Sequence, residues 1–167
     1  MNPKIFFITG TSGSGKTTLV QRLQGLVPKY VHVHDFDEGG VPKNPDKDWR
    51  LQRTEYWLLR AKNYLLEQQT TVVCGVCVPA EIQGSPSFEE GLDIYYGFLS
   101  IPEQEIRRRL KERMWEPAEI EGNIAWAKYL EHEVRAQQKH YIIDSERNNP
   151  KNVASKVMEW IEKECEF

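Results

Sequence analysis

The sequence predicts an α/β fold with three layers, in which helices cover both faces of a five-stranded parallel sheet. Two observations carry this prediction. Short apolar runs alternate along the chain with longer segments whose apolar residues repeat at helical spacing. One run, 70–76, is β-branched or apolar at nearly every position, which suits a strand buried on both faces of a parallel sheet. Because parallel strands are joined by right-handed crossovers, this order puts helices on both faces.

The elements follow from these runs in chain order. The expected strands are short, apolar and bounded by glycine, proline or polar residues, and they span 5–9, 31–34, 70–76, 93–99 and 141–144. The expected helices carry apolar residues three or four positions apart, and they span about 16–27, 48–69, 100–115, 118–134 and the segment from 149 onward. The segment 77–92 contains Gly84, Pro86 and Gly91, so we expect a loop there.

Two of the helix starts carry capping signals. Ser100 and Glu103 have the spacing of a capping box, in which each side chain satisfies a free backbone donor. Asn149 followed by Pro150 is typical of an N-cap and a first helical residue. We therefore expect helices to begin just after Ser100 and just after Asn149.

Length and composition predict one folded domain over residues 1–167. The chain has 167 residues, and domains most often hold roughly 100 to 150. Hydrophobic residues make up 40%, far from the composition of disordered segments. Lys and Arg number 22 against 25 Asp and Glu, and this net charge of -3 argues against a protein that covers a long stretch of nucleic-acid phosphate.

The sequence shows neither an export signal nor a membrane-spanning run. The apolar residues 5–8 are too few for a signal-peptide core, and the run 72–80 is far shorter than the roughly 20 residues that cross a bilayer. We therefore expect a cytoplasmic protein that binds no membrane and forms a monomer or a homodimer. Cys74 and Cys77 form a C-x-x-C, which could be a redox motif but in valine-rich surroundings indicates buried strand thiols.

A glycine-rich segment between the first strand and the first helix matches the phosphate-binding pattern G-x-x-x-x-G-K-[ST] at every fixed position. Its residues are Gly10, Thr11, Ser12, Gly13, Ser14, Gly15, Lys16 and Thr17, with Thr18 beside them. Glycines let backbone N–H groups converge on an anion, and the helix start adds its positive end. Lys16 can reach the β- and γ-phosphates, and the Thr17 hydroxyl can ligate Mg²⁺. The segment therefore predicts ATP and Mg²⁺ as ligands, in preference to an ordinary glycine-rich turn.

Two large classes of nucleotide-binding protein do not fit the rest of the chain. The N-K-x-D tetrapeptide by which small GTPases recognise guanine does not occur in the sequence. The D-x-x-G match at 37–40 is short enough to arise by chance. The L-S-G-G-Q signature of transport ATPases is also missing.

Three features together resemble the small P-loop kinases, the group that includes adenylate, shikimate and gluconate kinases. They are the phosphate loop, the pair Asp35 and Asp37 after the second strand, and the arginine-rich run 101–113 after the fourth. The resemblance covers most of the chain. It implies a nucleotide-kinase-like P-loop fold with a short arginine-bearing lid at about 105–122, and an ATP-dependent phosphotransferase activity.

By this resemblance, Asp35 holds a Mg²⁺-bound water, and either Asp35 or Asp37 orients or deprotonates the acceptor hydroxyl. Both residues end the second strand, at the sheet edge of the phosphate loop. Solvated loop carboxylates or an Asx turn are the structural alternative. His32, His34 and Asp35 look like a metal cluster, but only the alternate residues His32 and His34 share a strand face, and no further histidine lies nearby in the sequence. A hydrolytic metal centre is therefore the weaker hypothesis.

Five basic residues lie within seven positions after the fourth strand. Arginines on a lid can stabilise a phosphoryl group during its transfer. The resemblance to the adenylate-kinase lid assigns adenine stacking to Arg109 and a phosphate contact to Arg113. We expect Arg107 and Arg108 to be solvated charges on the helix face. The second basic cluster of that lid is thinned here to Arg135, which argues against AMP as the acceptor.

Arg147 and Asn149 follow the last strand, where the resemblance packs loop backbone against adenine. Both are therefore candidate neighbours of the base. For Asn149 the alternative is the N-cap described above, and for Arg147 it is a surface charge.

The resemblance puts the acceptor between the second helix and the end of the third strand. Candidates on that helix are Trp49, Arg50, Arg53, Tyr56 and Arg60. Arg53 and Arg60 could bind a carboxylate or phosphate, and Gly75 could let a ligand approach the backbone. The three arginines occupy two helix faces, so at most two can point inward, and a simple amphipathic helix is the stronger alternative.

The leading hypothesis is ATP- and Mg²⁺-dependent phosphoryl transfer to a small hydroxylated or phosphorylated acceptor, most simply a nucleoside or nucleotide. In this hypothesis Lys16 and Arg113 stabilise the phosphoryl group, and Thr17 and Asp35 place Mg²⁺. Asp37 helps to position the acceptor. Two alternatives stay open: a nucleotide-dependent switch that acts through a partner, and a polynucleotide kinase, against which the acidic balance weighs.

Overall fold

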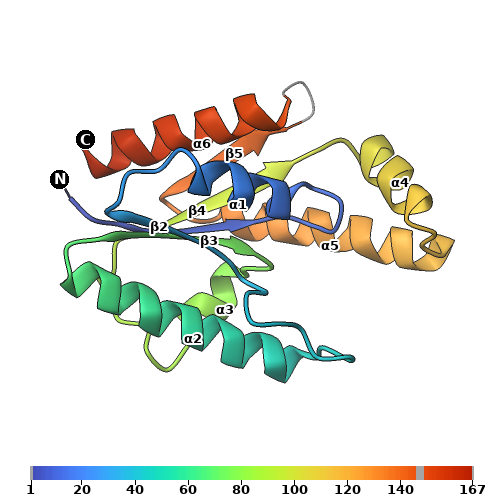
Figure 1. Cartoon of the computed structure of the whole chain (residues 1–167). Helices are drawn as coiled ribbons and strands as arrows, with labels where there is room; N and C mark the ends of the chain where they lie inside the picture. The colour runs from blue at the N-terminus through green and yellow to red at the C-terminus, as the bar shows by residue number, and fades with distance from the viewer. Residues whose placement is uncertain (1, 146–148, 167) are drawn as a thin grey trace.

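The computed structural model describes residues 2–145 and 149–166, and within them one parallel sheet in the order β2-β3-β1-β4-β5 (Figure 1). All neighbouring strands in this sheet pair in parallel. The strands are β1 (Ile5–Thr9), β2 (Val31–Asp35), β3 (Thr70–Gly75), β4 (Ile94–Ser100) and β5 (His140–Asp144). The predicted five-stranded parallel sheet is therefore confirmed.

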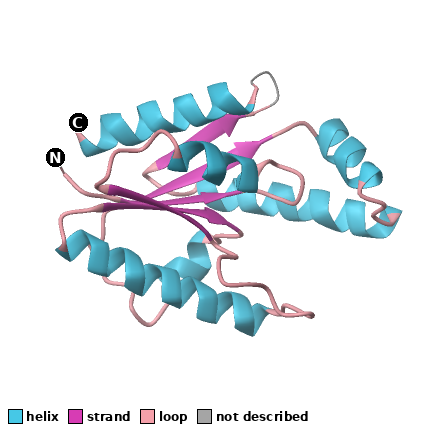
Figure 2. Cartoon of the chain, in the orientation of Figure 1, coloured by secondary structure: helices cyan, strands magenta, loops and turns pink. Residues whose placement is uncertain are grey.

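Helices cover both faces of the sheet, which confirms the three-layer architecture (Figure 2). They are α1 (Lys16–Gln24), α2 (Lys47–Leu66), α3 (Pro79–Gln83), α4 (Glu103–Glu112), α5 (Pro117–Arg135) and α6 (Pro150–Cys165). Helices α1 and α6 pack on one face, while α2, α3 and α5 supply buried residues to the other. Helix α4 lies beyond the end of the sheet, against α5 (Figure 1).

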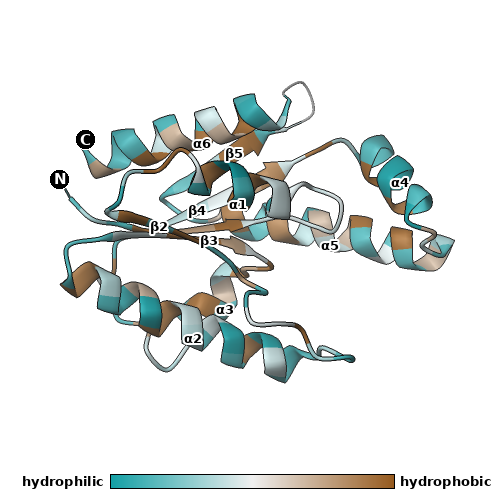
Figure 3. Cartoon of the chain, in the orientation of Figure 1, coloured by the Kyte–Doolittle hydropathy of each residue, from teal (hydrophilic) through white to brown (hydrophobic). Residues whose placement is uncertain are grey.

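The central strand β1 separates two apolar cores, because successive strand residues point to opposite faces. Phe6 and Ile8 join the core under α1 and α6, whereas Ile5 and Phe7 join the core under α2 and α5. Figure 3 shows largely hydrophobic strands between helices that carry both hydrophilic and hydrophobic residues. A third, small core holds α4 to α5 and is built around Leu110. Helix α4 thus has its own apolar support, separate from the main cores.

The strand register brings the candidate site to one edge of the sheet. Thr9, the last residue of β1, pairs with Gly75 of β3 and Phe98 of β4. Asp35, the last residue of β2, pairs with Cys74 of β3. Because all strands run in parallel, the loops that follow β1 and β2 leave the sheet at the same edge, with β3 between the two strands. Among the described helices, none is both long and apolar enough to serve as a membrane span.

The predicted capping box of Ser100 and Glu103 is wrong. Ser100 still belongs to β4, and its carbonyl oxygen accepts hydrogen bonds from the N–H and the Oγ of Ser145, each at 3.0 Å. Helix α4 starts at Glu103 after Pro102, without a side-chain cap. The sheet ladder extends one residue further than the sequence indicated, so Ser100 is not available as a cap.

Other boundaries sharpen the sequence predictions. Asn149 is the N-cap of α6 and accepts from the N–H of Asn152 at 2.9 Å, as predicted. The segment expected to be a loop after β3 contains the short helix α3, with proline at its first position. Cys74 and Cys77 are both buried free thiols, as expected, although Cys77 lies just beyond β3.

Candidate functional site

The phosphate loop occupies the turn between β1 and α1. Gly13 and Gly15 have φ angles of 82° and 98°, in the left-handed region that favours glycine. The Ser14 N–H donates to the carbonyl oxygen of Thr11 at 3.2 Å and closes the loop on itself. The backbone thus takes the shape that the glycine spacing predicted.

Lys16 folds back over this loop. Its Nζ donates to the carbonyl oxygens of Gly10 and Thr11, each at 2.8 Å. Burial lowers the pKa of Lys16 to about 8, while the negative charges of Asp37 and Asp35 oppose that shift. The ammonium is therefore charged near neutral pH, and it lies close enough to both carboxylates for the charges to interact.

Several donors of the loop have no partner within residues 2–145 and 149–166. The N–H groups of Gly13, Gly15 and Lys16 make no hydrogen bond there. The buried Ser14 hydroxyl also has no partner in this part of the chain. Unpaired donors that converge at a helix start are the arrangement by which proteins bind phosphate.

Asp35 and Asp37 form a tight turn at the end of β2. The Oδ1 of Asp35 accepts from the Asp37 N–H at 2.9 Å, which is the Asx turn named as the alternative. Burial and the neighbouring Asp35 charge raise the pKa of Asp37, against the opposing charges of Lys16 and Arg53. The Asx turn does not remove the pair from the site, because both carboxylates still lie close enough to Lys16 to act on its pKa.

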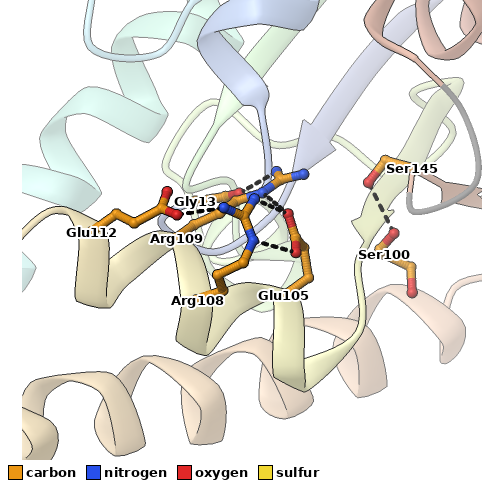
Figure 4. Close-up of polar contacts among 7 residues, drawn as sticks. All are labelled: Gly13, Ser100, Glu105, Arg108, Arg109, Glu112 and Ser145. Atoms are coloured by element: carbon orange, nitrogen blue, oxygen red, sulfur yellow. Dashed lines mark hydrogen bonds and ion pairs between the residues drawn. The ribbon is translucent and has the colours of Figure 1, made fainter.

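A cavity of about 260 Å³ adjoins the phosphate loop. Its lining comes from α1, β4, α4 and the start of α6, and comprises Ser14, Gly15, Thr18, Leu19, Leu99, Arg109, Ser145, Pro150 and Val153. Arg109 and Ser145 lie on either side of it (Figure 4). Asn149 borders this region, but its side chain caps α6, and Arg147 lies outside the described residues.

The arginines of α4 separate into two groups. Arg109 reaches the phosphate loop, where its Nη1 donates to the Gly13 carbonyl oxygen at 2.7 Å and its Nε to Glu105 at 2.7 Å (Figure 4). Arg113 is exposed at the end of α4 and has no side-chain partner among the described residues. The structure therefore brings Arg109 to the loop but leaves Arg113 away from it.

Arg107 and Arg108 lie on the outer face of α4, as expected, and each is also held in ion pairs. Arg107 forms ion pairs with Glu103 and Glu121. Arg108 forms ion pairs with glutamates on both sides of it in the helix, at 2.7 and 2.5 Å. These glutamates neutralise most of the positive charge that the sequence concentrates here, so α4 is not a free basic patch.

Asn123 of α5 is a contact residue that the sequence analysis missed. Its Oδ1 accepts from the Ser12 N–H and its Nδ2 donates to the Ser12 carbonyl oxygen, both at 3.3 Å. Its own carbonyl oxygen accepts from the Thr11 Oγ1 at 3.2 Å. The available signal was a polar side chain on the apolar stripe of α5, one turn before the buried Ala127.

On the acceptor side, the arginines of α2 are held by protein groups. Arg50 makes a bidentate ion pair with Glu81, at 2.8 and 2.6 Å. The guanidinium of Arg60 donates to the hydroxyls of Tyr56 and Tyr64, at 3.0 and 3.2 Å. Neither is presented to the edge where Asp37 lies.

Arg53 is the arginine of α2 that the structure brings to that edge. Its Nε donates to the Phe36 carbonyl oxygen at 3.0 Å, and its charge acts on the pKa of Asp37. Gly75 has a packing role here, since a Cβ at this position would lie 2.0 Å from the Phe36 Cβ. The space that glycine leaves at the end of β3 is therefore filled by Phe36.

The two histidines of β2 are bonded to side chains that do not form a set of metal ligands. His32 is hydrogen-bonded to Gln69 at 2.6 Å and stacks on Tyr64 at 4.1 Å between ring centres. His34 is hydrogen-bonded to Glu38 at 3.0 Å. No group of three or more His, Cys, Asp or Glu suited to a metal ion occurs among the described residues.

Comparisons with known proteins agree with this fold. A family model described as an AAA domain matches residues 6–130. A sugar kinase from Janibacter sp. superposes with a TM-score of 0.69 at 14% identity, over 96% of this chain and 95% of that chain. A gluconokinase from Sinorhizobium meliloti gives 0.62 at 14% identity, over 98% and 94%. A shikimate kinase from Acinetobacter baumannii in complex with shikimate gives 0.58 at 15% identity, over 97% and 94%.

No curated protein matches the chain. At these identities the structural likenesses speak to the fold, and that fold is the one of the small P-loop kinases. The predicted fold class and the resemblance to this group are therefore confirmed.

Proposed function

The chain belongs to the AAA domain family, and from this premise we propose that it transfers the γ-phosphoryl group of Mg²⁺-ATP to a small acceptor. The first candidates for the acceptor are nucleosides, nucleotides and similar hydroxylated metabolites. One observation carries the proposal: Lys16 lies at one sheet edge with Asp35 and Asp37, close enough for the charges of both carboxylates to act on the pKa of the lysine. The loop alone is enough to bind a nucleotide. Phosphoryl transfer also needs a group that orients or deprotonates the acceptor, and a carboxylate close to the lysine can do this.

On the nucleotide side, the backbone of the loop and the Lys16 side chain would both bind phosphate. The unpaired N–H groups of Gly13, Gly15 and Lys16 are suited to phosphate oxygens. The Lys16 ammonium would exchange its two carbonyl partners for the β- and γ-phosphates. The cavity beside Arg109 would hold the nucleoside.

Mg²⁺ fits the donors that the site offers. Thr17 is exposed at the first turn of α1, and Asp35 keeps a carboxylate oxygen that is not used by the Asx turn. Both are hard oxygen ligands of the kind that Mg²⁺ prefers. When bound, the ion would neutralise charge on the β- and γ-phosphate oxygens.

On the acceptor side, Asp37 would receive the proton of the attacking hydroxyl at a carboxylate oxygen. Its raised pKa makes it a better base than an ordinary carboxylate. Arg53 would face an anionic or polar group of the acceptor. Arg113 would reach the transferred phosphoryl group only if α4 moved relative to the loop.

The test is ADP release from Mg²⁺-ATP across a panel of nucleosides, nucleotides, sugar acids and hydroxy acids, with Lys16→Ala as the control. We expect one class of acceptor to stimulate release and the variant to lose that stimulation. A flat panel despite measurable ATP binding would contradict the proposal and favour a switch protein. Stimulation by oligonucleotides alone, strongest at low salt, would instead identify a polynucleotide kinase.

A further inference from the structure

We propose that Asn123 is a positioning residue of the phosphate loop, which sets the orientation of the two peptide groups on either side of the Ser12 Cα from helix α5. The proposal starts from the two hydrogen bonds of one side-chain amide. The Asn123 Oδ1 accepts from the Ser12 N–H and its Nδ2 donates to the Ser12 carbonyl oxygen. An amide side chain that contacts both polar groups of one residue fixes that residue against rotation, as a strand partner would.

The position of Ser12 in the loop explains how this contact can affect phosphate binding. Ser12 precedes Gly13, whose φ of 82° begins the left-handed part of the loop. Because the Ser12 N–H is taken by Asn123, it is not among the donors left for phosphate, which begin at Gly13. Asn123 thus holds the loop on one side while the unpaired donors follow on the other.

The attachment of α5 explains why this contact can be rigid. Ile120, Ile124 and Ala127 on the same helix are buried in the small core that also contains Leu110 of α4. Further along, Leu130 and Val134 of α5 join the main core under the sheet. A side chain that projects from a helix packed at both of its ends is a firm support for a glycine-rich loop.

A second contact from the lid reaches the next residue of the loop. Arg109 of α4 donates to the Gly13 carbonyl oxygen at 2.7 Å, and the Thr11 hydroxyl donates to the Asn123 backbone at 3.2 Å. The backbone from Thr11 to Gly13 is therefore held by residues about 100 positions away in the chain. Of these contacts, the two Asn123 side-chain bonds are removed by one substitution that leaves the helix backbone in place.

The first test needs no nucleotide: hydrogen exchange of the Ser12 amide, followed by NMR in the free protein. In Asn123→Ala we expect this amide to exchange about tenfold faster or more, because its acceptor is gone. In Asn123→Asp the acceptor oxygen remains, so protection should be largely restored. Gly122→Ala is the matched control, since a Cβ there meets nothing within 4 Å. Unchanged exchange in Asn123→Ala, or an equal rise in the control, would overturn the proposal.

The second test measures the dissociation constant of a fluorescent ATP analogue, and it rests on the proposed function. We expect Asn123→Ala to weaken binding about tenfold, because the loop must now be ordered by the ligand. Asn123→Asp should weaken it further, since it adds a negative charge near the phosphates. Unchanged affinity in Asn123→Ala together with faster exchange would also overturn the positioning role. If the wild-type protein binds no nucleotide, the proposed function fails, while the exchange experiment still decides what holds Ser12.

Discussion

The nucleotide side and the acceptor side of the site are built in opposite ways. The proposed nucleotide side is one contiguous segment, 10–17, in which the N–H groups of Gly13, Gly15 and Lys16 have no partner among the described residues. The acceptor side is assembled from side chains of α2, α3 and the turn after β2, and most of these are already paired with one another. Arg50 is bound to Glu81, and Arg60 to two tyrosines.

This difference shows why a charged helix face is a poor guide to a binding site. A backbone donor in a glycine-rich loop has few ways to be satisfied except by a ligand or water. A long arginine side chain on a helix can instead find a carboxylate, a carbonyl oxygen or an aromatic ring within the protein. Arg53 is the arginine of α2 whose charge still acts on Asp37.

The largest effect expected from this comparison is in Asp37→Asn. Loss of the carboxylate that accepts the hydroxyl proton should lower kcat by about 10²- to 10⁴-fold. Nucleotide affinity should be retained, because the loop donors are untouched. Steady-state kinetics and analogue titration below neutral pH measure both quantities while Lys16 stays protonated.

Glu38→Gln is the control for Asp37→Asn, since it removes the next carboxylate, which is bonded to His34. It should leave kcat unchanged. Full activity in Asp37→Asn would indicate that Asp35 is the base. A loss of nucleotide affinity in this variant would show that Asp37 also belongs to the nucleotide side.

A smaller pair of effects separates two arginines of α2: Arg53, whose charge acts on Asp37, and Arg50, which is paired with Glu81. Arg53→Ala should raise the acceptor KM about tenfold, by loss of a charged contact. Arg50→Ala should leave that KM unchanged but lower the free energy of unfolding by about 2 kcal/mol, because Glu81 loses its partner. The Glu81 side chain is only 12% exposed, so water replaces the arginine poorly.

Denaturant unfolding and acceptor titrations on both variants measure this contrast. The reverse pattern, with Arg50 affecting KM and Arg53 affecting only stability, would place the acceptor against α3 and not against the turn after β2.

The smallest expected effect is a pH dependence of nucleotide binding. Burial lowers the pKa of Lys16 to about 8 in the free protein. As the pH rises through that value the lysine loses its proton, and phosphate binding has to restore it. The dissociation constant of an ATP analogue should therefore rise above about pH 8, by up to about tenfold per pH unit.

Lys16→Arg keeps the charge at all these pH values and should give a flat profile if it still binds. A flat profile in the wild-type protein would show that Lys16 keeps its proton well above this range. The affinity for nucleotide would then depend more on the backbone N–H groups of the loop than on a lysine with a lowered pKa.

The sequence indicated the strands, the phosphate loop and the place of Arg107 and Arg108 on the outer face of a helix, because each depends on residues close together in the chain. Asp35 and Asp37 became candidates for the same reason, since they lie at and just after the end of a strand. The capping box at Ser100 failed because a two-residue pattern competed with sheet pairing, and Ser100 pairs with Asp144 of β5. A local sequence pattern therefore fails to predict the structure where its residue is instead taken into pairing with a distant strand.

The sequence by itself determined an α/β sheet with a phosphate-binding turn, because apolar periodicity and glycine spacing act within a few residues. Tertiary structure alone decided that Asn123 holds Ser12 and that Glu81 holds Arg50. It also decided that Phe36 fills the space at Gly75. These contacts join residues about 30 to 110 positions apart, and only the packing of helices on the sheet brings such residues within hydrogen-bonding or van der Waals distance.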